Sequence, residues 1–394
     1  MNGTIYMPVG EACSSISDTY RERKNMVTLI NTSDVLEGRV LNHERVPNSN
    51  LKGQFKKTFQ RDDILYSEIR PQNRRFAYVD FSPIDYIAST KLMVIRAKKD
   101  VVSPKYLYYF LKNSSTVAEL QLLAETRSGT FPQITFSEVA NLTIPVPSLA
   151  VQEVIVQTMQ CLEDKITCNE QINDNLEQQA QAIYHERFET VSPNDLPSDW
   201  RIVTLGEVAT ISNKSFNPLK EPEILLEHYS IPAFDEARFP AFELSTSIKS
   251  NKFIIDASCF MISKLNPTTK RVWKPYCLTG NAVCSTEFIV YKAKDQSITD
   301  FLYSVIDSGS FSDFMCSHVT GSTGSRQRTT PSDTLSYELI LPSEDELAEF
   351  QSLVSPMYAQ MRINAIENDK LKRLRDSLLP KLMSGEIDVS SVHL

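Results

Sequence analysis

The chain has 394 residues, of which 41% are hydrophobic and 23% are charged, and its formal net charge is −8. This length and composition suit a protein with two or three globular domains, and no apolar run is long enough to span a membrane. The start has no basic stretch before an apolar core, so we expect a cytoplasmic location. The seven cysteines form no C-x-x-C pair, which predicts reduced thiols and no zinc site.

The charge is distributed unevenly along the chain. Residues 1–148 carry 19 Lys and Arg against 15 Asp and Glu, whereas residues 149–189 carry 2 against 8. Because much of the negative charge lies in one segment, the net value does not exclude nucleic-acid binding by the other segments.

The first 148 residues have mainly strand signals, with expected strands at 76–79 and 91–95 and a short amphipathic helix near 104–111. A closing strand at 142–147 leads through Pro-Ser into a helical segment. The pattern therefore predicts a mixed α/β domain that ends where a long helix begins.

That helix is predicted over about 149–188, a stretch that contains neither Pro nor Gly. Its apolar residues follow a heptad pattern, which is typical of a helix that packs along another helix. Two positions in this seam are Asn, a residue that fixes register at some cost in stability. The two rows of the seam are Ile155, Leu162, Asn169, Leu176 and Ile183, and Met159, Ile166, Asn173 and Ala180.

A polar linker at 191–199 precedes a second domain, with expected strands at 253–255 and 288–291 and a helix at 299–306. After a closing strand at 339–342, the helical pattern resumes. Pro356 interrupts it, so we expect a short helix at about 344–354 before the second long helix. The seam of the second helix matches the first at an offset of 195: Phe350, Met357, Asn364, Leu371 and Leu378, with Val354, Met361 and Asn368 between them.

The match extends over most of the chain at an offset of 195 or 196. Gly10-Glu11 recurs as Gly206-Glu207, and Ile64-Leu-Tyr-Ser-Glu-Ile69 corresponds to Phe260-Met-Ile-Ser-Lys-Leu265. Such a repeat indicates a tandem duplication. The predicted fold is α+β, with two tandem mixed α/β domains and two long helices that form an antiparallel coiled coil. The expected boundaries are 1–148 for the first domain, 149–190 for the first helix, 191–342 for the second domain, and 343–394 for the second helix and tail.

Catalytic motifs are absent from the sequence. It contains no phosphate-binding G-x-x-x-x-G-K-[ST] loop, no G-x-G-x-x-G fingerprint, no H-E-x-x-H pair and no G-x-S-x-G elbow. We therefore expect no enzymatic activity, no metal site and no cofactor on this chain. An enzyme would have to place a hydrolytic site among Asp62, Asp63 and Glu68.

Basic loops recur at equivalent places in the two repeats. The loop at 70–75 reads Arg-Pro-Gln-Asn-Arg-Arg, and the loop at 266–271 reads Asn-Pro-Thr-Thr-Lys-Arg. A second pair of loops, at 127–133 and 324–328, precedes the closing strands. Basic side chains bind phosphates, and Arg, Asn and Gln can hydrogen-bond to base edges, so these loops predict DNA contacts, although each could also be a solvated hairpin loop. The candidate residues are Arg70, Gln72, Asn73, Arg74, Arg75, Arg127, Lys264, Asn266, Lys270, Arg271, Lys274, Arg326, Gln327 and Arg328.

The chain resembles the DNA-specificity subunit of type I restriction-modification systems. The resemblance rests on Leu196-Pro-Ser-Asp-Trp200 with Leu205-Gly-Glu-Val-Ala209, on Ile144-Pro-Val-Pro-Ser148, and on Leu374-Arg-Asp-Ser-Leu-Leu379 with Ser384-Gly385. It implies two target recognition domains, held apart by the coiled coil, that bind a bipartite DNA sequence. It also implies docking of two methyltransferase subunits, which carry S-adenosylmethionine, and of restriction/translocase subunits. The first repeat departs from this pattern because it lacks the Leu-Pro-x-x-Trp lead-in seen at 196–200.

The helix length fits this interpretation, because about 25 seam residues span roughly 37 Å, close to one DNA turn of about 34 Å. Two alternatives remain. One is a specificity subunit of a related system with a fused or differently organised nuclease–methylase partner. The other is a symmetric protein-interaction scaffold without sequence-specific DNA contact.

Overall fold

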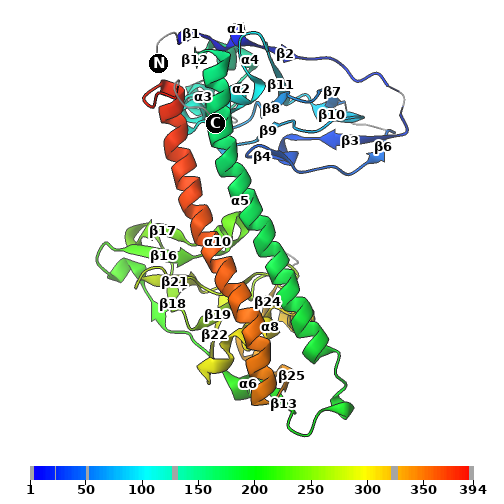
Figure 1. Cartoon of the computed structure of the whole chain (residues 1–394), viewed down its shortest axis with the longest axis vertical. Coiled ribbons are helices and arrows are strands. Elements are labelled where there is room, and N and C mark those ends of the chain that lie inside the picture. Colours follow the sequence, from blue (N-terminus) through cyan, green and yellow to red (C-terminus); the bar gives the residue numbers. More distant parts are fainter. Residues whose placement is uncertain (1–3, 23, 50–52, 127–131, 321–326, 390–394) are drawn as a thin grey trace. The chain divides into compact units, whose positions relative to one another are not determined.

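The computed structural model describes residues 4–22, 24–49, 53–126, 132–320 and 327–389. The chain divides into two compact units (Figure 1). Unit 1 consists of Met1–Ile166 and Leu371–Leu394, and unit 2 of Thr167–Lys370. Each unit therefore contains one mixed α/β domain and a part of each of the two long helices.

Unit 1 is built on three antiparallel or mixed sheets. The central sheet has the order β2-β11-β8-β9, and its register pairs Ile64 with Ile95. The strands of the three sheets are β2 Cys13–Ile16, β11 Leu92–Ala97, β8 Ile64–Ser67 and β9 Phe76–Tyr78; β6 Val46–Pro47, β3 Met26–Ile30, β10 Tyr86–Ser89 and β7 Phe55–Lys57; and β1 Ile5–Pro8 with β12 Thr143–Val146. A small hairpin, β4 Val35–Leu36 and β5 Arg39–Val40, and the helices α1 Val9–Ala12, α2 Pro104–Lys112, α3 Ser114–Thr126 and α4 Phe136–Asn141 complete the unit.

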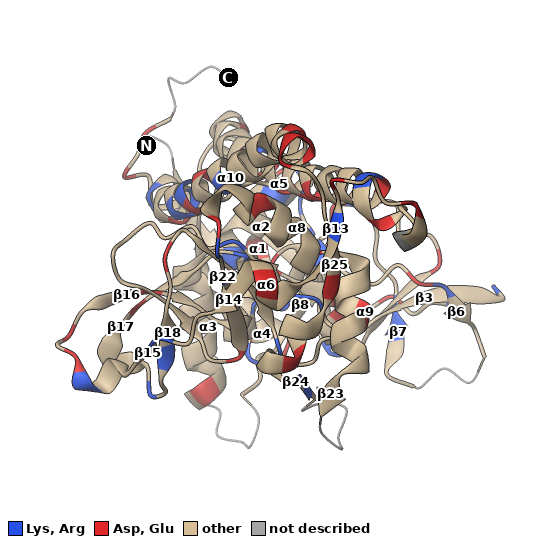
Figure 2. Cartoon of the chain, turned by 90° about the horizontal axis from the view of Figure 1, so that it is seen from below, with Lys and Arg blue, Asp and Glu red and all other residues tan. Residues whose placement is uncertain are grey.

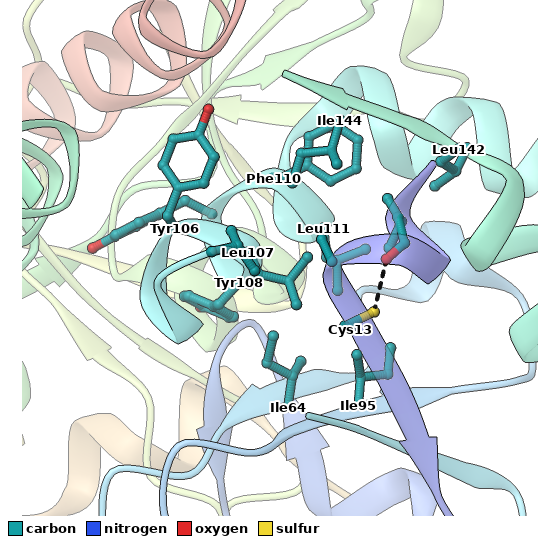
Figure 3. Close-up of a cluster of buried hydrophobic side chains, with 14 of the residues drawn as sticks. Cys13, Ile64, Ile95, Tyr106, Leu107, Tyr108, Phe110, Leu111, Leu142 and Ile144 are labelled. Carbon is teal, nitrogen blue, oxygen red and sulfur yellow. Dashed lines mark hydrogen bonds between the residues drawn. The ribbon is translucent and has the colours of Figure 1, made fainter. Parts of the chain in front are cut away.

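The core of unit 1 lies between the central sheet and α2. Figure 3 shows Leu107 and Leu111 of α2 above Ile64 and Ile95 of the sheet, and all four side chains are buried. The Cys13 thiol is also buried there and donates to the Val9 carbonyl at 3.2 Å (Figure 3). Burial raises the pKa of this thiol to about 12, so it stays protonated.

Unit 2 has the same plan, which confirms the predicted duplication of the fold. Its central sheet has the order β14-β22-β19-β20, and Phe260 pairs with Tyr291, the positions 196 residues after Ile64 and Ile95. The strands are β14 Ala209–Ile211, β22 Phe288–Ala293, β19 Cys259–Ser263 and β20 Val272–Trp273; β15 Ser215–Phe216, β18 Lys252–Ile254, β21 Ala282–Ser285, β16 Leu225–Tyr229 and β17 Ala241–Leu244; β13 Arg201–Thr204 with β25 Glu338–Leu341; and β23 Val319–Thr320 with β24 Arg328–Thr329. The helices are α6 Leu205–Val208, α7 Ile231–Ala237, α8 Thr299–Ile306 and α9 Gly309–Ser317.

The repeated glycine has a packing cause in both units. A Cβ atom added at Gly10 would lie 3.0 Å from the Cβ of Ala140, and one added at Gly206 would lie 3.2 Å from the carbonyl oxygen of Leu335. Both glycines lie in the first short helix of their domain, so each allows that helix to approach the segment before the closing strand.

The two long helices are α5, Leu149–Tyr184, which continues as a π-helical turn at His185–Glu189, and α10, Glu344–Ser384 (Figure 1). In unit 1, Ile155 and Met159 of α5 share the core with Leu379, Leu382 and Met383 of α10. In unit 2, the core contains Ala180 and Tyr184 of α5 together with Phe350, Val354 and Tyr358 of α10. The two helices therefore contribute to one core within each unit. Ile155, Met159, Ala180, Phe350 and Val354 belong to the predicted seams, whereas Leu379, Leu382, Met383, Tyr184 and Tyr358 lie beside them.

The expected break at Pro356 is wrong, because α10 runs without interruption from Glu344 to Ser384. Pro356 lies on the exposed side of the helix, where the hydrogen bond it cannot donate would face water. Val354 and Tyr358, on either side of it, are buried in the core of unit 2. Tertiary packing on one face thus holds the helix together across the proline.

Four asparagines form a polar ladder between α5 and α10 in unit 2. Asn169 donates through Nδ2 to Asn368 Oδ1 at 2.8 Å, and Asn364 donates through Nδ2 to Asn173 Oδ1 at 2.8 Å. Residue numbers rise along α5 while those of their partners fall along α10, so the helices are antiparallel. Asn173 Nδ2 also donates to the Met361 carbonyl at 3.2 Å. The predicted seam asparagines therefore pair with one another.

Replacing Asn364 by leucine is expected to destabilise unit 2 by about 1–3 kcal/mol, because Asn173 loses its buried donor. The double variant Asn173→Leu with Asn364→Leu should recover most of that loss, since both polar partners are then absent. Urea unfolding measures both changes, and Asn175→Leu, an exposed position on α5, is the control. A double variant that is as unstable as the sum of the singles would contradict this assignment.

The carboxy-terminal tail packs against unit 1. Val389 is buried in its core, and Ile387 packs against the same cluster. In unit 2, Trp200 of the lead-in packs against Phe188 with ring centroids 5.7 Å apart. The tail thus contributes to the core of unit 1.

Candidate DNA interface

The loops after β8 and β19, in the middle of each domain, begin in the same way. Ser67 Oγ accepts from the Ile69 amide at 3.0 Å, and Ser263 Oγ accepts from the Leu265 amide at 3.2 Å. The next residue adopts a left-handed conformation in both units, with φ of 44° at Arg70 and 47° at Asn266. Residues other than glycine rarely adopt this conformation, and strain of this kind often accompanies function.

Within each unit, this loop contacts the segment before the closing strand. The Arg70 amide donates to the Pro132 carbonyl at 3.1 Å, and the Asn266 amide donates to the Gln327 carbonyl at 2.9 Å. Within each unit, the described end of the second predicted loop, 132–133 or 327–328, therefore lies beside the first predicted loop. Arg127 and Arg326, which belong to the second pair, lie outside the described residues.

The basic side chains of the first loop have different partners. The Arg74 guanidinium is 39% exposed, donates to Ser114 Oγ at 2.9 Å, and lies 3.8 Å from a Glu37 carboxylate oxygen. The Arg75 guanidinium instead donates to the Ser33 carbonyl at 2.9 Å. Arg74 thus remains accessible to a ligand, whereas Arg75 ties the loop to the preceding hairpin. Arg70, Gln72 and Asn73 are exposed.

Beside this loop lies a groove of about 400 Å³ between the 3₁₀ turn Pro71–Asn73 and α3. Gln121 joins its two sides, because its Oε1 accepts from the Gln72 amide at 3.2 Å and its Nε2 donates to Glu125 at 2.8 Å. Amide, guanidinium and carboxylate groups together with an exposed leucine suit base edges and the thymine methyl group. Helix α3 was not predicted as part of the site, since its place beside the loop depends on the fold. The groove is lined by Gln72, Arg74, Ser114, Val117, Ala118, Gln121, Leu122 and Glu125.

In unit 2, most of the predicted cations form ion pairs within the domain. Arg271 donates two hydrogen bonds to Asp235, at 2.6 and 2.8 Å, and Arg328 donates two to Glu287, both at 2.9 Å. The Arg328 guanidinium lowers the pKa of the Glu287 carboxyl. Lys270 Nζ lies 2.7 Å from Asp307 Oδ1 and donates to the Asp307 carbonyl, and Lys274 pairs with Asp300. Figure 2 shows Lys and Arg interspersed with Asp and Glu over the chain.

The polar residues of the second loop are less engaged. The buried amide oxygen of Asn266 has no hydrogen-bond donor among the described residues, although such an atom normally finds one. Gln327 and Lys264 use their backbone groups, with the Lys264 amide donating to the Glu287 carbonyl at 2.9 Å. Asn266 therefore offers an unfilled acceptor beside the strained turn.

The three carboxylates of the alternative hydrolytic site are each engaged by a cation. Asp63 is buried and accepts two hydrogen bonds from Arg96, at 2.7 and 2.8 Å. Asp62 accepts from Lys99 at 2.7 Å, and Glu68 pairs with Lys91 at 3.5 Å. The Lys99 contact lowers the pKa of Asp62. These contacts hold the three groups in structural ion pairs.

The buried carboxyl of Asp307 should make the stability of the fold depend on pH. Burial raises its pKa to about 6, and the attraction of Lys270 only partly opposes that shift. The unfolded chain therefore releases this proton near pH 4, and the folded chain near pH 6. The contribution of Asp307 to stability falls as pH rises through this interval, by about 3 kcal/mol at full ionisation. Asp307→Asn should flatten the dependence of urea midpoints on pH between 4 and 7, whereas the exposed Asp313→Asn should not; equal slopes in both variants would refute the assignment.

Within the described part of the chain, no group of three or more His, Cys, Asp or Glu residues is arranged to hold a metal ion. No helix among the same residues is long and apolar enough to cross a membrane.

Known proteins share both the sequence and the fold. A family model described as type I restriction modification DNA specificity domain matches residues 19–178. The chain is 29% identical to the HindI specificity subunit of Haemophilus influenzae, over 92% of this chain and 94% of that protein. The chain is therefore similar to type I restriction-modification specificity subunits over most of its length. It is also 25% identical to the MjaIX specificity subunit of Methanocaldococcus jannaschii, over 79% of this chain and 77% of that protein.

A solved S subunit of a type I restriction-modification system from M. genitalium has the same fold, with a TM-score of 0.54 at 14% identity, over 97% of this chain and 96% of that chain. Specificity subunits are the non-catalytic DNA-recognition components of these systems, which agrees with the expectation that this chain is not itself an enzyme.

Proposed function

We propose that this specificity subunit binds a bipartite DNA sequence, with one half-site contacted by the domain of unit 1 and the other by the domain of unit 2. The observation that supports this most strongly is the pair of equivalent loops, each with a left-handed residue, at Arg70 and at Asn266. The scaffold is the same in the two units, but the side chains on it differ. A chain with two such domains would therefore recognise two different half-sites separated by a fixed spacer.

The two sites are expected to use different chemistry. In unit 1, the groove beside α3 combines Gln72, Arg74 and Glu125 with exposed Leu122, a set suited to base edges. In unit 2, the amide oxygen of Asn266 is buried and has no donor among the described residues, and a rearrangement of the loop on binding would let it receive an amino group from adenine or cytosine. Cations already paired inside the domain, such as Arg271, contribute mainly to loop structure.

The partners follow from the family. The subunit is proposed to dock two methyltransferase subunits and the restriction/translocase subunits, and S-adenosylmethionine would be bound by the methyltransferase. The domain boundaries proposed for this assembly are 1–148 and 191–342, joined by the long helices.

Methylation mapping tests the proposal directly. The subunit is expressed in a host lacking methylation of its own, together with its methyltransferase partner, and modified bases are mapped with and without the subunit. A bipartite motif with a fixed gap that vanishes when the subunit is omitted is the expected result. Methylation unaffected by the subunit would favour the scaffold without sequence-specific DNA contact, for which the internal ion pairs of unit 2 are the supporting observation.

A further inference from the structure

Unit 2 contains a cavity of about 380 Å³ away from its strained loop. Its walls come from α5, α7, α8 and α10 and from the segment that follows β20. Lys274, which the sequence placed among the DNA contacts, lines this cavity instead, and its ammonium group is paired with Asp300. The cavity has a size typical of sites for small molecules.

Aromatic rings form the walls. Tyr303 and Tyr358 meet edge to face, with centroids 4.9 Å apart, and Phe234 and Trp273 do so at 5.3 Å. Tyr276 adds a fifth ring. Flat aromatic walls bind flat ligands by stacking and edge contacts.

One buried donor on this wall has no partner. Trp273 is 3% exposed, and its indole N–H has no hydrogen-bond acceptor among the described residues. Burial raises the pKa of Tyr276 to about 12, and the nearby indole acts in the opposite direction. The indole N–H therefore lies near the Tyr276 hydroxyl, but the two groups do not have the geometry of a hydrogen bond. The Tyr276 hydroxyl donates to the Arg238 carbonyl at 3.0 Å. A buried donor without an acceptor costs free energy. The indole nitrogen has no exposed surface in this structure, so a ligand with a ring nitrogen would recover that free energy after a small movement of the wall uncovers the N–H.

The rim of the cavity is mainly cationic. Arg238 pairs with Glu177 at 2.8 Å, and Lys274 pairs with Asp300. Arg362 is exposed on α10 and donates through Nη2 to the Tyr276 carbonyl at 3.1 Å, which uses one of its five N–H groups. The guanidinium can therefore still bind an anionic group at the mouth.

We propose that this cavity binds a purine nucleotide. The base would lie among the aromatic rings and accept a hydrogen bond from Trp273, and the phosphate would contact Arg362. Purines fit better than pyrimidines because their two fused rings offer a larger stacking surface. The site belongs to unit 2 alone, since the positions equivalent to Trp273 and Tyr358 in the repeat are Ala77 and Glu163.

The chain offers a direct optical probe, because it has only two tryptophans. In a Trp200→Phe background, the fluorescence of the full-length subunit reports on Trp273 alone. Adenosine 5′-monophosphate should cause a saturable change in this signal. Adenosine should cause the same change with about tenfold weaker affinity, because it lacks the phosphate.

Two variants separate the parts of the site. Arg362→Ala should weaken binding of adenosine 5′-monophosphate about tenfold and leave adenosine within about twofold. Ala359→Phe, at an exposed position that lines the cavity, should block both ligands. Ser352→Phe places the same ring at an exposed position of α10 outside the cavity and should bind both ligands normally.

No saturable fluorescence change with adenosine 5′-monophosphate at millimolar concentration would overturn the proposal, as would undiminished binding by Ala359→Phe. A Trp273 response to the methyltransferase subunit alone, blocked by Ala359→Phe, would instead identify the cavity as a protein-docking pocket. DNA binding by the same variants is measured separately, so failure here leaves the bipartite-reader function untouched.

Discussion

Replacing Arg74 by alanine is expected to weaken binding to one half of the proposed bipartite target about tenfold, while Arg75→Ala changes the affinity for either half less than about twofold. The two residues are adjacent and carry the same charge, but their guanidinium groups have different surroundings. Arg74 is 39% exposed and makes one hydrogen bond to a side chain, at Ser114. Arg75 donates to two backbone carbonyls, those of Ser33 at 2.9 Å and Val35 at 3.4 Å. Of these two residues, Arg74 is therefore the one expected to contact a phosphate or base, since two backbone carbonyls already hold Arg75.

The measurement is fluorescence anisotropy of the subunit assembled with its methyltransferase, using duplexes in which one half-site at a time is scrambled. If Arg74 contacts a phosphate, the slope of log K against log salt should fall by about one in Arg74→Ala. Arg75→Ala should keep the slope and lose about 1 kcal/mol of stability through its hydrogen bond. Equal losses of DNA affinity in both variants, or weaker binding to both half-sites in Arg74→Ala, would contradict recognition of each half-site by a separate domain.

The backbone of the molecule could be predicted from the sequence to a large extent. In a tandem repeat, each strand or helix expected in one copy is also expected at the equivalent position of the other. The pairing of Ile64 with Ile95 accordingly has its counterpart in the pairing of Phe260 with Tyr291. The helix expected near 299–306 and the strand near 288–291 are present as α8 and β22. The break expected at Pro356 is absent because helix propensity takes no account of tertiary packing. Val354 and Tyr358, on either side of the proline, are buried in the core of unit 2.

The hydrogen-bond and ion-pair partners of the side chains could not be predicted from the sequence. Arg271 has its partner Asp235 at a distance of 36 residues in sequence, and Lys270 has Asp307 at 37. Two adjacent basic residues in a loop look the same in the sequence whether their side chains face solvent or pair with a carboxylate of the same domain. Only the fold separates accessible cations from those that hold the loop, and for this reason α3 was missed as one side of the groove.

Glu227 illustrates the same limit, since nothing in its neighbourhood predicts that a charged residue of β16 is fully buried. Its carboxylate accepts hydrogen bonds from the Tyr229 hydroxyl at 2.5 Å and from the backbone amides of Leu278 and Thr279 at 3.0 and 2.8 Å. The Tyr229 hydroxyl in turn accepts from the Cys277 amide at 2.9 Å. One carboxylate thus organises the segment that follows β20, including part of the wall of the cavity.

Glu227→Ala is therefore expected to destabilise unit 2 by about 3 kcal/mol, because the buried Tyr229 hydroxyl and two partly buried backbone amides lose their acceptor together. Glu227→Gln keeps one acceptor oxygen and should cost about half as much. Glu236→Ala, at an exposed position of α7, should stay within about 0.5 kcal/mol of the unmodified chain. Urea unfolding gives the three values, and hydrogen exchange locates the effect, since the amides of Leu278 and Thr279 should lose protection first. If these amides stay protected in Glu227→Ala, the segment is held by its other contacts, and Glu227 does not organise it.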